Sequence, residues 1–95
     1  MFGTRLKELR EYMQLPQRQI ASVIDVDTAT YCKIEKGDRK AKKMQVIVLA
    51  DFFNVGKEEL ISLWLADKIT DVAMQEKECA NNALALAGEF ISKNE

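Results

Sequence analysis

Apolar residues recur at helical spacing along almost the whole chain. Leu6, Leu9 and Met13 are three and four residues apart in the first segment, and similar spacing continues to Ile91. No stretch alternates apolar and polar residues as a half-buried strand would. The single proline, Pro16, lies where a helix is expected to begin, a position that tolerates proline. The chain is therefore expected to be all-α.

Composition limits this chain to one small soluble domain. Its 95 residues are 47% hydrophobic and 31% charged, a balance that excludes a disordered or collagen-like chain. No run reaches the roughly 18 apolar residues that span a membrane. The chain has no histidine, and Cys32 and Cys79 lack the spacing of metal ligands. We therefore expect a cytoplasmic protein with reduced thiols, no metal, no cofactor, no small-molecule ligand and no enzyme activity.

Five helical segments are expected, over residues 4–13, 16–25, 28–36, 43–53 and from 57 onward. Gly37 is expected to end the third, because glycine accepts the left-handed backbone found after helices. Arg10 is assigned to the polar face of the first helix, and Ala29, Tyr31 and Ile34 to the inner face of the third. The predicted core stripe of the fourth helix is Met44, Ile47, Ala50 and Phe53. The polar run 75–78 either bends the C-terminal segment or lies within one long helix.

The second and third segments are typical of a helix-turn-helix, in which two short helices pack closely across a short turn. Small Ala21 permits the close approach, and Val26 fills the angle between the helices. The outer face of the third helix is then free to enter a DNA major groove. A basic loop follows, in which residues 36–43 hold five basic residues and one acid.

On these residues the sequence resembles the phage-repressor/Cro (XRE) family of bacterial DNA-binding proteins. The resemblance covers residues 4 to about 65. It implies a lambda-repressor-like five-helix DNA-binding domain over residues 1–66, followed by a C-terminal helical extension over 67–95. The stretches that carry it are Leu15–Ala21, Ile24–Asp27, Ile34–Arg39, Asn54–Val55 and Glu58–Leu60.

The chain departs from the family pattern at two positions. Pro16 stands where the family usually has the serine or threonine that caps the second helix, so that side-chain cap is expected to be absent. Asp25 stands where the family often has glycine. Aspartate tolerates left-handed geometry better than most residues, so the turn is still expected to form.

The resemblance implies two sets of DNA contacts. Base contacts are expected from Thr28, Ala29, Cys32 and Lys33. Contacts to the DNA backbone are expected from Gln17, Arg18, Asp27, Thr30, Tyr31, Lys36, Arg39, Lys40, Lys42 and Lys43. Simpler interpretations stay open: Thr28 or Asp27 as a helix cap only, Cys32 as a small residue that avoids a clash, Tyr31 as core, and the basic loop as a solvated surface.

The sequence therefore predicts a sequence-specific, nucleoid-associated transcriptional regulator of a bacterium or phage that binds a two-fold operator as a homodimer and could regulate its own gene. The alternative is an antitoxin or another module whose C-terminal helices bind a protein. Residues 1–56 carry three surplus basic residues and residues 57–95 four surplus acids, so the C-terminal half is expected to face away from DNA. The expected dimer interface consists of Phe52, Trp64, Ile69, Val72, Leu84, Ala87 and Ile91.

Overall fold

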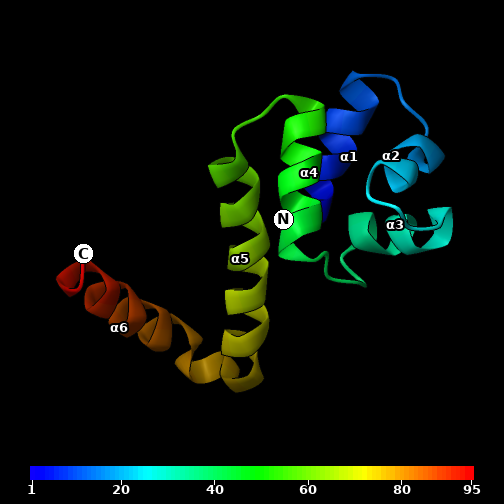
Figure 1. Ribbon diagram of the computed structural model, residues 1–95. Helices are drawn as coiled ribbons and strands as arrows, with labels where there is room; N and C mark the ends of the chain where they lie inside the picture. The colour runs from blue at the N-terminus through cyan, green and yellow to red at the C-terminus, as the bar shows by residue number, and fades with distance from the viewer.

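The computed structural model describes residues 1–95 and contains helices only, which confirms the predicted all-α class (Figure 1). Five helices form the N-terminal part, and a turn of 3-10 helix leads into a sixth helix that points away from them. The elements are α1 Phe2–Tyr12, α2 Gln17–Val23, α3 Thr28–Lys36, α4 Lys43–Phe53, α5 Lys57–Ala73, η1 Met74–Cys79 and α6 Ala80–Lys93.

Local signals set the ends of the helix-turn-helix. Asp27 caps α3 by accepting a hydrogen bond from the Thr30 amide at 2.7 Å, and Gly37 ends it at a φ of 84°. Asp25 adopts the expected left-handed backbone, with a φ of 55°. Pro16 precedes α2 as its N-cap rather than forming its first turn, and it provides no side-chain cap. For α3, the cap at Asp27 and the end at Gly37 confirm the predicted bounds, residues 28–36.

The buried face of α4 differs from the predicted stripe. Val46 and Leu49 are fully buried together with Ala50 and Phe53, whereas Met44 is 67% exposed. Ile47, the other member of the predicted stripe, is only half-buried. Because α4 is apolar on nearly every side, its periodicity does not distinguish the face that packs against α5 from the face left in water.

One core joins the first five helices. Its largest fully buried side chains are one from each of α1, α2, α3 and α5 and two from α4, so that no helix of the five is peripheral. α6 adds no residue to this core; its only buried residue is Ala80. These fully buried side chains are Leu6, Ile20, Tyr31, Val46, Leu49 and Leu60.

Gly3 allows the backbones of α1 and α3 to meet. A Cβ atom at this position would lie 2.3 Å from the carbonyl oxygen of Glu35 and 2.6 Å from that of Ile34. Both neighbours are backbone atoms at the end of α3, which cannot move aside as a side chain would. Only glycine fits between α1 and the end of α3.

Gly3→Ala is therefore expected to lower the free energy of unfolding by about 3 kcal/mol, at the upper end of the usual range for overpacking. The matched control is Gly88→Ala in α6, where nothing lies within 4 Å of the added Cβ. That change should instead stabilise its helix, by about 0.5–1 kcal/mol. Urea unfolding of both variants measures the difference, and equal stabilities would contradict the close approach.

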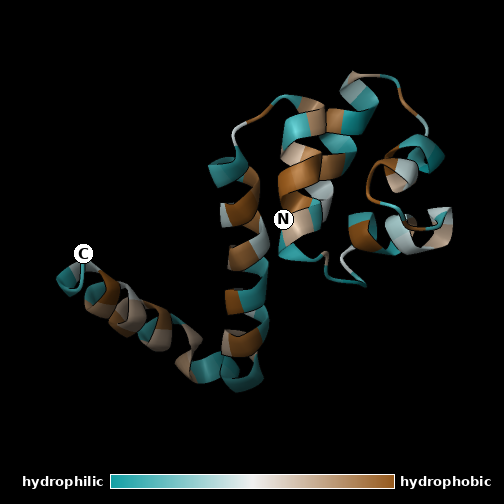
Figure 2. Cartoon of the chain, viewed as in Figure 1, coloured by the Kyte–Doolittle hydropathy of each residue, from teal (hydrophilic) through white to brown (hydrophobic).

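The C-terminal segment forms two helices, which settles the alternative left open by its sequence. The polar run lies within η1, where Glu76 leaves helical geometry at a φ of −126° and a ψ of 73°. The predicted boundary at residue 66 falls inside α5, which belongs both to the core and to the extension. Hydrophobic residues continue along α5 beyond the core toward this turn (Figure 2). None of the helices is long and apolar enough to span a membrane.

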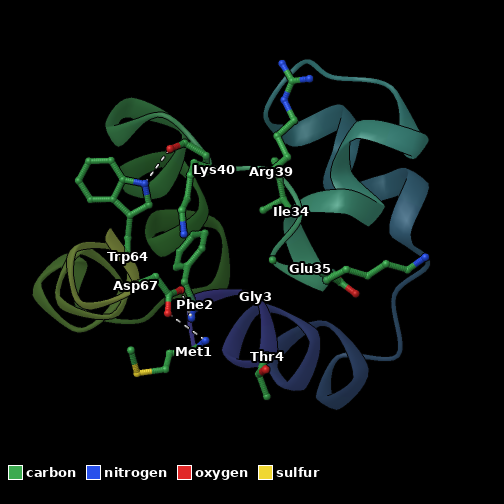
Figure 3. A pocket seen from close by; sticks show the side chains of 13 residues that line it. Met1, Phe2, Gly3, Thr4, Ile34, Glu35, Arg39, Lys40, Trp64 and Asp67 are labelled. Carbon is green, nitrogen blue, oxygen red and sulfur yellow. Dashed lines mark hydrogen bonds and ion pairs between the residues drawn. The ribbon is translucent and has the colours of Figure 1, made fainter. Parts of the chain in front are cut away.

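Asp67 attaches α5 to the beginning of α1. One carboxylate oxygen accepts a hydrogen bond from the Phe2 amide at 2.9 Å, and the other lies 3.2 Å from the amino group of Met1 (Figure 3). α1 has no acidic residue in its own first turn, so Asp67 supplies the negative charge that favours a helix N-terminus. Burial alone would raise the pKa of Asp67, but these two partners lower it below its usual range.

Candidate DNA-binding surface

α3 has one face in the core and one face in water. Tyr31, Ile34 and Glu35 are buried against the neighbouring helices, whereas Thr28 and Lys33 are exposed. Ala29 is also exposed, so its expected place on the inner face is wrong. Because Ala29 is exposed, its side chain is still accessible for the predicted contact with a DNA base. Three of the four residues predicted to contact bases thus share an open surface, and Cys32, the fourth, is half-buried at its edge.

A buried ion pair holds α3 in place. The Nε and Nη2 atoms of Arg10 donate to the two carboxylate oxygens of Glu35, at 2.7 and 3.1 Å. A third Arg10 nitrogen donates to the Leu15 carbonyl at 3.0 Å, before α2 begins. The Arg10 and Glu35 side chains are 13% and 4% exposed. This bidentate pair fixes α1, the start of α2 and the end of α3 relative to one another.

The charge state of Glu35 depends on these partners. Burial by itself would raise the pKa of Glu35, since a carboxylate loses its hydration in the core. Hydrogen bonds from Arg10 and Gln17 outweigh that effect and lower the pKa below its usual range. Glu35 is therefore ionised in the folded protein at neutral pH. Its partner Arg10 faces inward, so the assignment of Arg10 to the polar face of the first helix is wrong.

Two predicted DNA contacts are engaged inside the protein. The Gln17 side chain donates to Glu35 at 3.1 Å and accepts from the thiol of Cys32 at 2.8 Å, so its amide already bridges α2 and α3. Tyr31 is completely buried, and its hydroxyl has no hydrogen-bond partner. Burial raises the pKa of that hydroxyl far above its usual range. A fully buried side chain cannot reach a phosphate, so the predicted backbone contact of Tyr31 is wrong and its interpretation as a core residue holds.

Basic side chains surround the exposed face of α3. Arg18 lies at the start of α2, and four basic residues between the end of α3 and the start of α4 are exposed with no acidic partner: Lys36, Arg39, Lys42 and Lys43. Lys40 is different, because its ammonium lies 2.6 Å from Asp71 of α5. The basic residues predicted to contact DNA thus follow one another along the chain from α2 through α3 to the start of α4. One of them, Lys40, is already paired.

The seven residues expected at a dimer interface fall into two groups. Phe52 and Trp64 pack against the protein's own core, and the Trp64 indole donates to the Ala41 carbonyl at 2.7 Å (Figure 3). The other five are exposed or line an apolar groove between α5 and α6. Its walls are Lys68, Ile69, Val72, Ala73, Ala83, Leu84 and Ala87. We name this surface the α5–α6 groove.

No group of three or more His, Cys, Asp or Glu side chains lies close enough to hold a metal ion. A small pocket beside α1 is lined in part by Lys36, Arg39, Lys40 and Asp67, and the Asp67 carboxylate is already engaged by Phe2 and Met1. The chemistry of the surface around α3 is that of hydrogen-bond donors and positive charges beside an exposed helix.

Comparison with known proteins also indicates a helix-turn-helix domain. The family model described as a helix-turn-helix domain matches residues 1–63, which is more than half of the chain. A transcriptional repressor named RstR of the cryptic phage CTXphi, from Vibrio cholerae, is 37% identical over 62 residues. That match covers 65% of this chain and 56% of the repressor. No solved structure matches the chain significantly. The chain therefore belongs to the helix-turn-helix domain family.

Proposed function

We propose that this protein is a sequence-specific transcriptional regulator that places α3 in the major groove of its operator. The observation that carries the proposal is the division of α3 into a face locked by Glu35 and a face presenting Thr28, Ala29 and Lys33 to water. The major groove admits one helix, and lysine and threonine side chains have partners on base edges there. Matching the CTXphi repressor over 56% of its length supports a similar role here.

The surrounding charges support the same orientation on DNA. Lys36, Arg39, Lys42 and Lys43 flank α3 at the positions from which phosphate contacts would fix its register. α5 and α6 extend away from α3 (Figure 1), and the acidic surplus of residues 57–95 lies in α5, in η1 and at the C-terminal residue Glu95, whereas α6 itself is neutral. Repulsion between this acidic half and DNA favours binding through the basic half.

We further propose that the protein binds as a homodimer formed through the α5–α6 groove. Val72 and Leu84 line the groove and are 66% and 41% exposed, and exposed apolar clusters mark interaction sites. α6 forms one wall of the groove and carries the exposed Ile91 one helical turn after Ala87, so two copies can exchange the same surface in a two-fold arrangement. Such a dimer suits a two-fold operator with half-sites about one DNA turn apart.

A protein partner other than a second copy is the alternative that this groove supports. An antitoxin, for example, would cover it with a different chain. The molecular mass of the purified protein in solution separates these cases. A stable dimer on its own favours the homodimer, whereas a monomer that becomes stable only with a product of a neighbouring gene favours the alternative.

The test of base recognition is Lys33→Ala. Because its ammonium is exposed on the outer face of α3, its loss should cost about 1–3 kcal/mol on DNA that the wild-type protein selects, and much less on random DNA. Lys57→Ala, an exposed lysine at the start of α5, is the control and should change neither affinity. An equal loss of affinity for selected and random DNA would show that Lys33 contacts the backbone and not a base.

A further inference from the structure

We propose that Trp64 is a positioning residue for the phosphate contacts of the basic loop between α3 and α4. The proposal rests on the proposed DNA-binding function. It concerns a residue that does not itself contact DNA but orients residues that do. Trp64 lies on α5, beyond residues 1–63 that match the family model. Its indole reaches across to the loop and donates to a backbone carbonyl there (Figure 3).

One peptide group of the loop is held at both ends. The Ala41 carbonyl accepts a hydrogen bond from the Trp64 indole at 2.7 Å, and the Lys42 amide of the same peptide donates to the Gln45 side chain at 2.8 Å. Ala41 itself is 4% exposed, so its methyl group is anchored in the core. Because the peptide is planar, holding both its C=O and its N–H restricts its rotation more than either hydrogen bond would alone.

That orientation determines where the neighbouring cations point. Lys40 and Lys42 flank Ala41, and Lys43 begins α4 immediately afterwards. Lysine side chains are flexible, but their reach starts from a Cα position and a Cα–Cβ direction that the backbone sets. A loop free to rotate about this peptide would have to lose that freedom on binding DNA, and the lost entropy would weaken every phosphate contact it makes.

Trp64 is itself held firmly enough for this role. Its ring is half-buried against the core, and the ammonium of Lys68, one helical turn later, lies 3.7 Å from the ring centroid. Lys40 also pairs with Asp71 on the same helix. α5 thus supports the loop at two points, and Lys68 is also part of the wall of the α5–α6 groove.

Trp64→Phe tests the proposal, because it keeps an aromatic ring in the core and removes only the indole donor. Affinity for both selected and random DNA should fall about fivefold, the equivalent of one ordinary hydrogen bond. The slope of log affinity against log salt should become shallower by up to about 0.9, the value of one phosphate contact. Exchange of the Lys42 amide with solvent should accelerate in the free protein. Gln45→Met, which releases the other end of the peptide, should act in the same direction.

Ile61→Ala is the matched control, since Ile61 lies on the same helix, packs against the core and makes no side-chain hydrogen bond. It should lower the stability of the fold but leave the salt slope and the Lys42 exchange rate unchanged. Normal DNA binding by Trp64→Phe, with an unchanged slope and exchange rate, would overturn the role of Trp64. A wild-type protein that fails to bind any DNA would overturn the proposed function itself, a result distinct from the first.

Discussion

Glu35→Ala is expected to lower the free energy of unfolding by about 3–5 kcal/mol, the usual result of removing one partner of a buried ion pair. The loss is large because Arg10 would keep its charge at 13% exposure without a carboxylate to neutralise it. Gln17 would also lose its acceptor. A small domain is stable by only about 5–15 kcal/mol in total, so this variant should be largely unfolded at modest urea concentrations.

A second substitution should reverse much of this loss. Replacing both partners, as in Arg10→Met with Glu35→Leu, removes both charges from the core, and buried pairs replaced by apolar residues are often neutral in stability. The exposed pair between Arg5 and Glu59 is the matched control, because its Nε–Oε2 distance is also 2.7 Å. Glu59→Ala should change stability very little, since water screens that pair. A Glu35→Ala variant as stable as Glu59→Ala would contradict the role of the buried pair.

The same pair makes stability depend on pH. The pKa of Glu35 is lower in the folded protein than in the unfolded chain, so its contribution is present above the unfolded pKa of about 4.3. That contribution is lost as pH falls through the lower, folded value. Asp67 acts in the same direction. Urea unfolding between pH 7 and pH 3 should show stability falling below about pH 4.5, and the double Arg10→Met, Glu35→Leu variant should show a flatter decline.

If the protein is the proposed dimer, Leu84→Asp is expected to dissociate it and to weaken binding to a two-fold operator by about 10²–10⁴-fold, the usual contribution of linking two binding modules. Leu84 lines the α5–α6 groove, where an aspartate would bring an unpaired charge into the proposed interface. The five-helix core should remain folded, because α6 contributes no residue to it. Sedimentation measures the mass, and titration with selected DNA measures the affinity.

Leu86→Asp separates a loss of the interface from a general effect of charge on α6. Leu86 lies on the same helix, is 66% exposed and does not line the groove. It should leave both mass and DNA affinity close to those of the wild-type protein. If Leu84→Asp remained a dimer with unchanged DNA affinity, the groove would not be the interface between copies.

The parts of the fold that sequence predicted well are those set by local chemistry. Gly37 ends α3 as expected, and Asp27 caps its start, which was one of the interpretations that the sequence left open. The polar run before Cys79 left a bend and one long helix as alternatives, and the structure has the bend. The fourth helix shows the limit of this approach: with apolar residues on all sides, only its contact with α5 determines that Val46 is buried and Met44 is exposed.

Long-range contacts account for the site features that sequence missed. Arg10 was assigned to water because its own helix offers it no partner, and Glu35 lies 25 residues further along the chain. Gly3 carried no signal, since only the arrival of α3 makes a larger residue impossible there. Trp64 matched an apolar stripe and was assigned to an interface, but its indole nitrogen finds an acceptor 23 residues away. In each case the residue itself gives no indication of the distant residue that it contacts in the folded protein.

Selection of bound sequences from random double-stranded DNA at physiological salt tests the central claim most directly. A helix-turn-helix dimer that reads bases through Thr28, Ala29 and Lys33 should recover a two-fold consensus, with half-sites centred about 34 Å, or one DNA turn, apart. Lys33→Ala should recover a consensus relaxed at one position in each half-site. Bound DNA without any shared sequence would contradict base recognition by α3 and would leave the basic loop as a non-specific DNA-binding surface.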